Sequence, residues 1–184
     1  MKFEFVILTK LINVILIICL VSSCSDRLQK IKNQSKIIFL PTSIAENINT
    51  KYTDSGQLKS ILLSPKMINF SNEEFPFYEF PNGINLTLLS KNNDSSKIIS
   101  NRAVVYNDTD IIDLRGNVVL TTNTNDTLFT DQLYYDQKEE WLFTDSAVKF
   151  RTTDYITYGN GFDSNQNFTN AQVLEVTGSI FIEQ

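Results

Sequence analysis

Apolar and polar residues alternate with a period of two through the C-terminal half of the chain. Between residues 112 and 120 one face collects the apolar positions Ile112, Leu114, Val118 and Leu120. This alternation is typical of a half-buried β-strand, and it returns in residues 142–150 and 171–182. No window after residue 24 has the three- and four-residue apolar spacing of an amphipathic helix, so we predict an all-β body.

An internal repeat underlies this alternation. When the sequence is aligned with itself so that Ile112 matches Leu142, the apolar positions after Ile112 match those after Leu142. A second, slightly longer shift matches Leu142 with Leu174. The same alignment sets Gly178 in the place of Gly116. Each unit contains two strands and a polar turn, and a single hairpin of this kind cannot bury its apolar face alone. We therefore predict stacked antiparallel β-hairpins around a shared core, with open ends.

The N-terminal residues predict a leader and a linker before the β-domain. Residues 11–23 form an uncharged apolar run that is shorter than the roughly 20 residues of a spanning helix, and the last four residues before and including Cys24 resemble a bacterial lipobox. We assign 1–23 to a signal or leader segment, 24–50 to a linker anchored through acylated Cys24, and 51–184 to the β-domain. Residues 41–56 are predicted as a loop. An uncleaved membrane anchor is the alternative to acylation, and both place the body outside the cytoplasm.

Two interpretations of the stacked apolar faces remain open at this point. They can form an ordinary sandwich core filled by its own side chains, or a trough that receives long apolar chains. The last strand, predicted over 171–182, is apolar on one face with no covering element after it, and such an edge can accept a strand from another protein. Gly116 and Gly178 fall on the inward face, where glycine often marks a bulge or a close backbone approach.

The composition excludes much chemistry. The 184 residues include no His, and the two cysteines, Cys19 and Cys24, both precede the predicted β-domain. The body therefore has no His-based nucleophile or proton shuttle and no thiolate or imidazole metal site. The net charge of −5 and the absence of a basic stripe argue against nucleic-acid binding. We predict a protein that is not an enzyme, without catalytic residues, cofactor or metal.

A resemblance to a known family is carried by short segments in a fixed order. They are YTDSG (52–56), SP (64–65), FPFYEFPNGI (75–84), NRAVVY (101–106), LRGNV (114–118), LFTDQL (128–133) and GNGF (159–162), followed by Gly178. Together they resemble the LptC family, the periplasmic component of the lipopolysaccharide export machinery, in its lipoprotein-leader form. The predicted acylated cysteine replaces the spanning helix of the best-known members.

The resemblance implies a fold, a ligand and partners. The implied fold is an open-ended β-jellyroll whose interior carries the acyl chains of lipopolysaccharide. The N-terminal edge would dock on the periplasmic domain of an ABC-transporter permease, and the C-terminal edge strand would pass lipid to a bridge protein of similar fold. The implied location is the periplasmic face of the inner (plasma) membrane of a Gram-negative bacterium, held through the leader or Cys24.

We expect the apolar inward residues to contact acyl chains. The expected lining consists of Ala103, Val105, Ile112, Leu114, Val118, Leu120, Leu142, Val148, Phe150, Leu174, Val176 and Ile180. The alternative function is a structural or adhesive cell-surface lipoprotein whose β-sandwich binds a protein or glycan through its loops. A separate candidate site is a sugar-stacking platform of Trp141, Tyr134 and Tyr135, although cross-strand pairing is the commoner use of such aromatic residues.

Overall fold

A computed structural model describes residues 40–90 and 94–182 of the protein. These residues form one twelve-stranded antiparallel sheet. The strands are β1 (Ser43–Asp54), β2 (Gln57–Phe70), β3 (Phe77–Phe80), β4 (Ile84–Leu89), β5 (Ser95–Ser100), β6 (Arg102–Tyr106), β7 (Ile111–Thr122), β8 (Thr127–Asp136), β9 (Trp141–Arg151), β10 (Tyr155–Asn165), β11 (Ala171–Val173) and β12 (Val176–Phe181). The predicted all-β fold is confirmed, and the described residues contain no helix.

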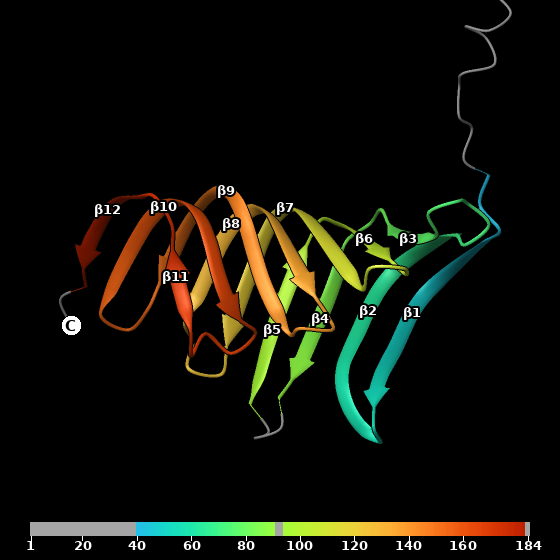
Figure 1. The fold of residues 1–184 in the computed structure, drawn as a ribbon, viewed down its shortest axis with the longest axis horizontal. Helices are drawn as coiled ribbons and strands as arrows, with labels where there is room; N and C mark the ends of the chain where they lie inside the picture. Colours follow the sequence, from blue (N-terminus) through green and yellow to red (C-terminus); the bar gives the residue numbers. More distant parts are fainter. Residues whose placement is uncertain (1–39, 91–93, 183–184) are drawn as a thin grey trace, which may run out of the picture. The chain divides into compact units, whose positions relative to one another are not determined.

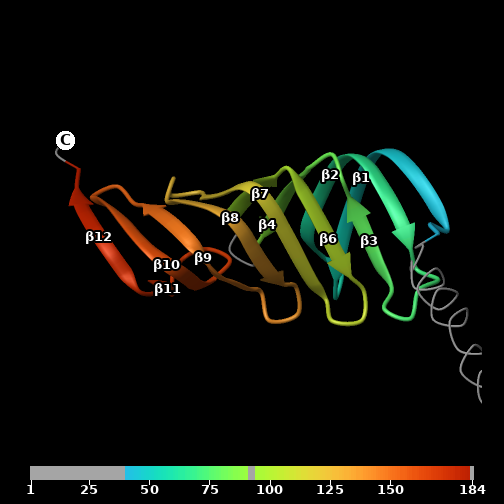
Figure 2. The same cartoon turned by 90° about the horizontal axis from the view of Figure 1, so that it is seen from above.

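Most consecutive strands pair as hairpins, and the strands are stacked side by side in Figure 1. The exceptions are β3 and β4, β5 and β6, and β11 and β12, which do not pair with each other. β2 and β7 are long, and each pairs along one edge with two shorter strands. β4 and β5 lie between one half of β2 and one half of β7, whereas β3 and β6 lie between the other halves. Two layers therefore enclose an apolar interior. Figure 2 shows the stack from above, with β1 to β3 at one end and β10 to β12 at the other.

The pairing register traces the inward face from strand to strand, because directly opposed residues of antiparallel strands point to the same side. One inward row crosses six strands and consists of Leu62, Leu86, Ile98, Leu120, Leu128 and Phe150. All of these except Leu62 are buried in one continuous core. Each buried side chain of this size contributes about 1.5–3 kcal/mol, so this row stabilises the stack against the entropy of ordering the chain.

The predicted repeat is confirmed between β7 and β9. The inward positions of β7 at 112, 114, 118 and 120 are buried, and so are the corresponding positions of β9 at 142, 144, 148 and 150. The two strands also bend at equivalent places. In β7 the pairing with β8 shifts between Arg115 and Val118, where Gly116 and Asn117 have φ angles of 76° and 47°. Gly116 therefore marks a β-bulge, as the sequence predicts.

A buried hydroxyl lies at the bend of several strands, and the apolar alternation does not predict it. Each hydroxyl occupies an otherwise apolar inward position within hydrogen-bond distance of the carbonyl oxygen two residues later. These contacts run from Ser64 to Lys66 (3.0 Å), from Ser100 to Arg102 (3.0 Å) and from Thr130 to Gln132 (3.2 Å). Ser64 and Thr130 lie still closer to a second carbonyl oxygen, that of Gly83 (2.7 Å) and that of Ala147 (3.0 Å). A bend interrupts the hydrogen bonds between the strands. The hydroxyl then donates to a backbone carbonyl oxygen at that point. The signal in the sequence is a Ser or Thr that interrupts the apolar face.

The loop predicted over residues 41–56 is wrong, because Ser43–Asp54 is strand β1. β1 pairs with β2 along its whole length, and the two are joined by a two-residue turn at Ser55 and Gly56, both of which have positive φ. Two positive φ angles are typical of a type I′ hairpin turn. The strand escaped detection because most of its side chains are exposed, so no apolar alternation is required. The linker predicted for 24–50 thus runs into β1 from Ser43 onward.

The single last strand predicted over 171–182 is also wrong. It is divided into β11 and β12 at Leu174 and Glu175, where Glu175 has a φ of 40°. Leu142 and Ala171 both oppose Ser164, so the third copy of the repeat aligns Leu142 with Ala171 instead of Leu174. The sequence alignment placed this copy too far along the chain because a break in a strand leaves no mark in the apolar alternation.

The residues of β12 therefore take other places in the stack than the sequence repeat gives them. The bend of the third copy lies at Glu175, so Gly178 does not take the place of Gly116. A shift in pairing opposite Thr177 also reverses the alternation within β12: Val176 shares an inward row with Val148, whereas Ile180 opposes Ile156 on the outer face. Side chains of β12 are largely exposed because no second layer covers them.

Candidate functional site

Most residues predicted to line a trough come together on the inward face. Those on β6, β7 and β9 are buried, or partly buried for Val105, in one core cluster: Ala103, Val105, Ile112, Leu114, Val118, Leu120, Leu142, Val148 and Phe150. The remaining three lie at the C-terminal end of the stack and are exposed, Leu174 by 38%, Val176 by 59% and Ile180 by 56%. The first group therefore forms a shared interior. The second group lies outside it, with Ile180 on the outer face.

The interior around β7 to β10 is filled by its own side chains. Leu114, Leu120 and Leu142 have no solvent-exposed surface. Toward β10 the rings of Phe150 and Phe162 pack with their centroids 5.3 Å apart. In this part of the stack, the arrangement is that of a packed sandwich core.

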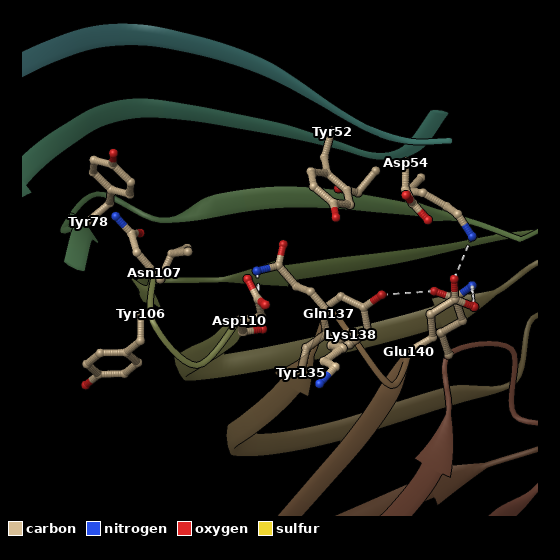
Figure 3. Close-up of a pocket in the computed structure, with 14 residues that line it drawn as sticks. Tyr52, Asp54, Tyr78, Tyr106, Asn107, Asp110, Tyr135, Gln137, Lys138 and Glu140 are labelled. Atoms are coloured by element: carbon tan, nitrogen blue, oxygen red, sulfur yellow. Dashed lines mark hydrogen bonds and ion pairs between the residues drawn. The ribbon is translucent and has the colours of Figure 1, made fainter. Parts of the chain in front are cut away.

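The N-terminal half has an open cavity instead. Its volume is about 560 Å³, and its walls come from β1, β2, β3, β6 and β8 and from the turns after β6, β8 and β10. Figure 3 shows Tyr52 and Asp54 on one side and Tyr135, Gln137 and Glu140 on the other. The lining combines tyrosine rings and Val105 with carboxylates, amides and the Lys59 ammonium. The cavity can thus take a ligand with both apolar and polar parts.

A polar network spans the rim of this cavity. Lys59 Nζ lies 2.8 Å from Glu140 Oε1, and Gln166 Nε2 donates to Glu140 Oε2 at 3.4 Å. The Tyr135 hydroxyl donates to Gln166 Oε1 at 3.1 Å. Lys59 is on β2, which has no sheet pairing with β8 or β9, the strands that flank Glu140. The network therefore joins parts of the sheet that the β-ladders do not connect.

The network has a definite charge state at neutral pH. The hydrogen bond with Glu140 raises the pKa of the Lys59 ammonium, against a smaller opposing effect of burial. Burial raises the pKa of the Tyr135 hydroxyl, and the nearby carboxylate of Glu140 adds to this. Lys59 is therefore charged and Tyr135 neutral, which are the forms that donate in the hydrogen bonds observed.

Alkaline pH is expected to destabilise the protein through these two groups. Both pKa values are higher in the folded protein than their ordinary values of 10.0 for tyrosine and 10.5 for lysine. The stability that they contribute is fully present below about pH 10 and is lost as the pH rises through the folded values. Urea midpoints at about pH 7 and about pH 11 measure the loss. Tyr135→Phe should show a smaller loss over the same interval, and an unchanged loss would exclude Tyr135 as a source.

Each end of the sheet has a strand with an unpaired edge in the described part of the chain. β1 pairs only with β2, and β12 pairs only with β10. Ile44 on β1 and Phe181 on β12 are exposed. Unpaired N–H and C=O groups beside apolar side chains are a template for a further strand. Both ends can therefore accept another protein by strand addition.

The close backbone approach predicted at glycine occurs, but at a different residue. A Cβ on Gly159 would contact the carbonyl oxygen of Leu174 and would lie 2.5 Å from Val173 Cγ1. A Cβ on Gly178 would meet nothing within 4 Å. Gly159 therefore allows the segment that joins β11 and β12 to lie against β10.

The outer aromatic residues pair across strands. Tyr134 and Phe143 are opposed on β8 and β9 and stack with centroids 5.2 Å apart. The indole N–H of Trp141 donates to the Asp163 carboxylate. Tyr135 lies on the inward face, so it does not share a platform with Trp141 and Tyr134. Cross-strand pairing thus accounts for these rings.

The fold and the site together define a class of protein, a β-jellyroll with an apolar interior, a lateral cavity and an open edge at each end. A family model described as "Lipopolysaccharide-assembly, LptC-related" matches residues 11–180. The chain therefore belongs to the LptC family, as its sequence segments predict. No curated protein matches the chain. Membership in this family implies a role in lipopolysaccharide transport, and the family is associated with the periplasm and the inner membrane of Gram-negative bacteria.

Some predicted features cannot be compared with the structure. The leader 1–23, the anchor Cys24 and the linker up to residue 39 lie outside the described residues. In residues 40–90 and 94–182 there is no helix that could cross a membrane. The same residues contain no group of acidic, Cys or His side chains suited to a metal ion.

Proposed function

We propose that this protein is a membrane-anchored periplasmic carrier that receives lipopolysaccharide from an ABC-transporter permease and passes it to a bridge protein of similar fold. The observation that carries the proposal is the continuous apolar inward face, which extends across the stack between two open edges. Acyl chains would lie against this face, beginning in the open cavity, where the layers leave space between them. Family membership supports lipopolysaccharide as the ligand.

Transport along such a face needs no catalytic group. Moving an acyl chain from one apolar environment to another changes its free energy little, whereas exposure to water costs about 25 cal/mol for each Å². The carrier's task is therefore to keep the chains covered during each step. Directionality would come from the ATPase of the transporter.

The two sheet edges supply the partner contacts in this proposal. The β1 edge would dock on the periplasmic domain of the permease, and the β12 edge on the bridge protein. Main-chain hydrogen bonds give such strand additions their affinity, and side chains in neighbouring pockets give specificity. Acylated Cys24, or the uncleaved leader, would hold the protein at the inner membrane, since several acyl chains together anchor a protein stably.

Lipopolysaccharide is expected to cross-link to the cavity and not to the outer face. Tyr78 and Val105 are opposed on β3 and β6, and both line the cavity. A photo-cross-linking amino acid at either position should capture lipopolysaccharide in cells. The same amino acid at Phe129, which is exposed on the outer face, is the matched control. Equal capture at Phe129 and at the cavity positions would exclude the interior route.

Lipid retention separates this function from the alternative of an adhesive cell-surface lipoprotein. A carrier purified without detergent should retain lipid in stoichiometric amounts. An adhesive β-sandwich with a purely structural core should not.

A further inference from the structure

We infer that the turn between β10 and β11, residues 166–170, is a displaceable plug that divides the interior, and that the Phe168 ring occupies a place that an acyl chain takes during transport. This inference rests on the proposed function and deepens it. It assigns a binding position and a gating contact within the carrier. Three features of the plug support it, namely the ring, its attachments and its position.

The Phe168 ring is partly buried and packs from the turn against the core cluster. Its centroid lies 5.3 Å from that of Phe150 and 5.4 Å from that of Phe162, and both contacts are edge-on. Phe168 has a φ of 59°, in the left-handed region that bulky residues rarely adopt. Turn residues usually face solvent. A strained turn residue whose ring packs on Phe150 and Phe162 therefore covers the apolar interior at a place where no β-ladder closes it.

Within the turn, Asn165 of β10 hydrogen-bonds to Phe168, Thr169 and Asn170. Gln166 attaches the turn to the other strands by hydrogen bonds and not by strand pairing. Its carbonyl oxygen accepts from Ser96 Oγ on β5 at 2.6 Å, and its backbone N–H donates to the carbonyl oxygen of Glu140 at 3.2 Å. In its side chain, Oε1 accepts a hydrogen bond from the Tyr135 hydroxyl, and Nε2 donates one to Glu140 Oε2. β5 is separated from β8 by β7 in the sheet, so one residue joins elements that are not neighbours. Such attachments can break and reform without unfolding a strand.

The plug stands between the open cavity and the closed interior. Gln166, Tyr135 and Glu140 line the cavity, and Phe168 follows them toward Phe150 and Phe162. An acyl chain in the cavity therefore meets this barrier before it can reach β10 and the β12 edge. The chain can replace the ring because both are apolar, and the polar groups freed at the rim can hydrogen-bond to water. The Lys59–Glu140 ion pair holds the adjoining turn in the closed position.

Cross-linking on both sides of the barrier tests the inference. The full-length protein is prepared with p-benzoylphenylalanine at Tyr78, which lines the cavity, or at Phe150, whose ring contacts the plug from the interior side, and is incubated with lipopolysaccharide. Phe168→Ala should raise capture at Phe150 by roughly threefold to tenfold, because it shifts the population toward the open state. Capture at Tyr78 should stay the same. The matched control is Phe75→Ala, since Phe75 is 74% exposed and lies in the turn before β3.

A second set of variants acts on the rim and leaves the core intact. Lys59→Glu replaces the ion pair with two carboxylates, which repel each other. It should therefore raise the capture of lipopolysaccharide at Phe150, as Phe168→Ala does. Combining Lys59→Glu with Glu140→Lys restores opposite charges and should return capture to the parental value. A thermal unfolding scan of each variant identifies any that fail to fold.

The outcomes distinguish the plug from the carrier function. Capture at Tyr78 with no increase at Phe150 in folded Phe168→Ala and Lys59→Glu would overturn the plug and leave the carrier function intact. Strong capture at Phe150 in the parent protein would also overturn it. Absence of capture at both positions in every variant would overturn the carrier function itself.

Discussion

Replacing Phe162 by Ala is expected to lower the free energy of unfolding by about 3–5 kcal/mol, the usual cost of removing a fully buried phenylalanine. Phe162 has no exposed surface and contacts the rings of Phe150 and Phe168. Neighbouring strands hold the walls of the resulting cavity apart, so the site can collapse only in part. Equilibrium urea unfolding, followed by the fluorescence of the single Trp141, measures the change.

A second Phe→Ala variant tests whether the loss of stability comes from the buried position and not merely from removing a phenylalanine ring. Phe75→Ala removes the same side chain from an exposed turn and should change the unfolding free energy by less than about 0.5 kcal/mol. Similar losses for the two variants would mean that the rings of β9 and β10 do not form a packed core.

Gly159→Ala is expected to displace the C-terminal edge of the sheet. The new Cβ would overlap the carbonyl oxygen of Leu174 and the side chain of Val173. A backbone carbonyl cannot turn aside as a flexible side chain can, so β11 and β12 must move away from β10. The expected cost is about 1–3 kcal/mol, as for other overpacked sites. Hydrogen exchange of the β11 and β12 amides should become faster. If β12 binds the proposed bridge protein, cross-linking between the two should also fall.

Gly178→Ala is the corresponding control at the same edge. An added Cβ there meets no atom within 4 Å, and Gly178 does not have a positive φ. The substitution should be neutral or stabilise the protein by about 0.4–1 kcal/mol, because alanine has less freedom in the unfolded chain. Faster exchange in Gly178→Ala and not in Gly159→Ala would contradict the close approach at Gly159.

The plug and the edges have different consequences for transport. Loss of the β12 edge should prevent delivery to a partner without changing entry into the cavity. Loss of the plug should ease passage beyond the cavity without changing either edge. Combining Gly159→Ala with Phe168→Ala therefore separates delivery from passage in one set of cross-linking measurements.

The sequence alone determined the fold class and the inward face of the central strands. Alternation in β7 and β9 identified Ile112, Leu114, Leu142 and Val148 as inward, and all four are buried. This works because a strand in a two-layer stack must place every second side chain in the core. The ordered segments also identified the family, since they include the bends and turns that the stack repeats.

Only the tertiary structure decided which residues meet across the interior. Lys59 and Glu140 are far apart in the sequence, and nothing in the local pattern of either predicts an ion pair. Phe168 lies in a polar turn, where its ring gives no alternation signal. The break at Glu175 likewise depends on how the segment packs against Gly159. Alternation specifies the face of each residue, but contacts between distant strands depend on register, bulges and packing, which arise only when the whole stack forms.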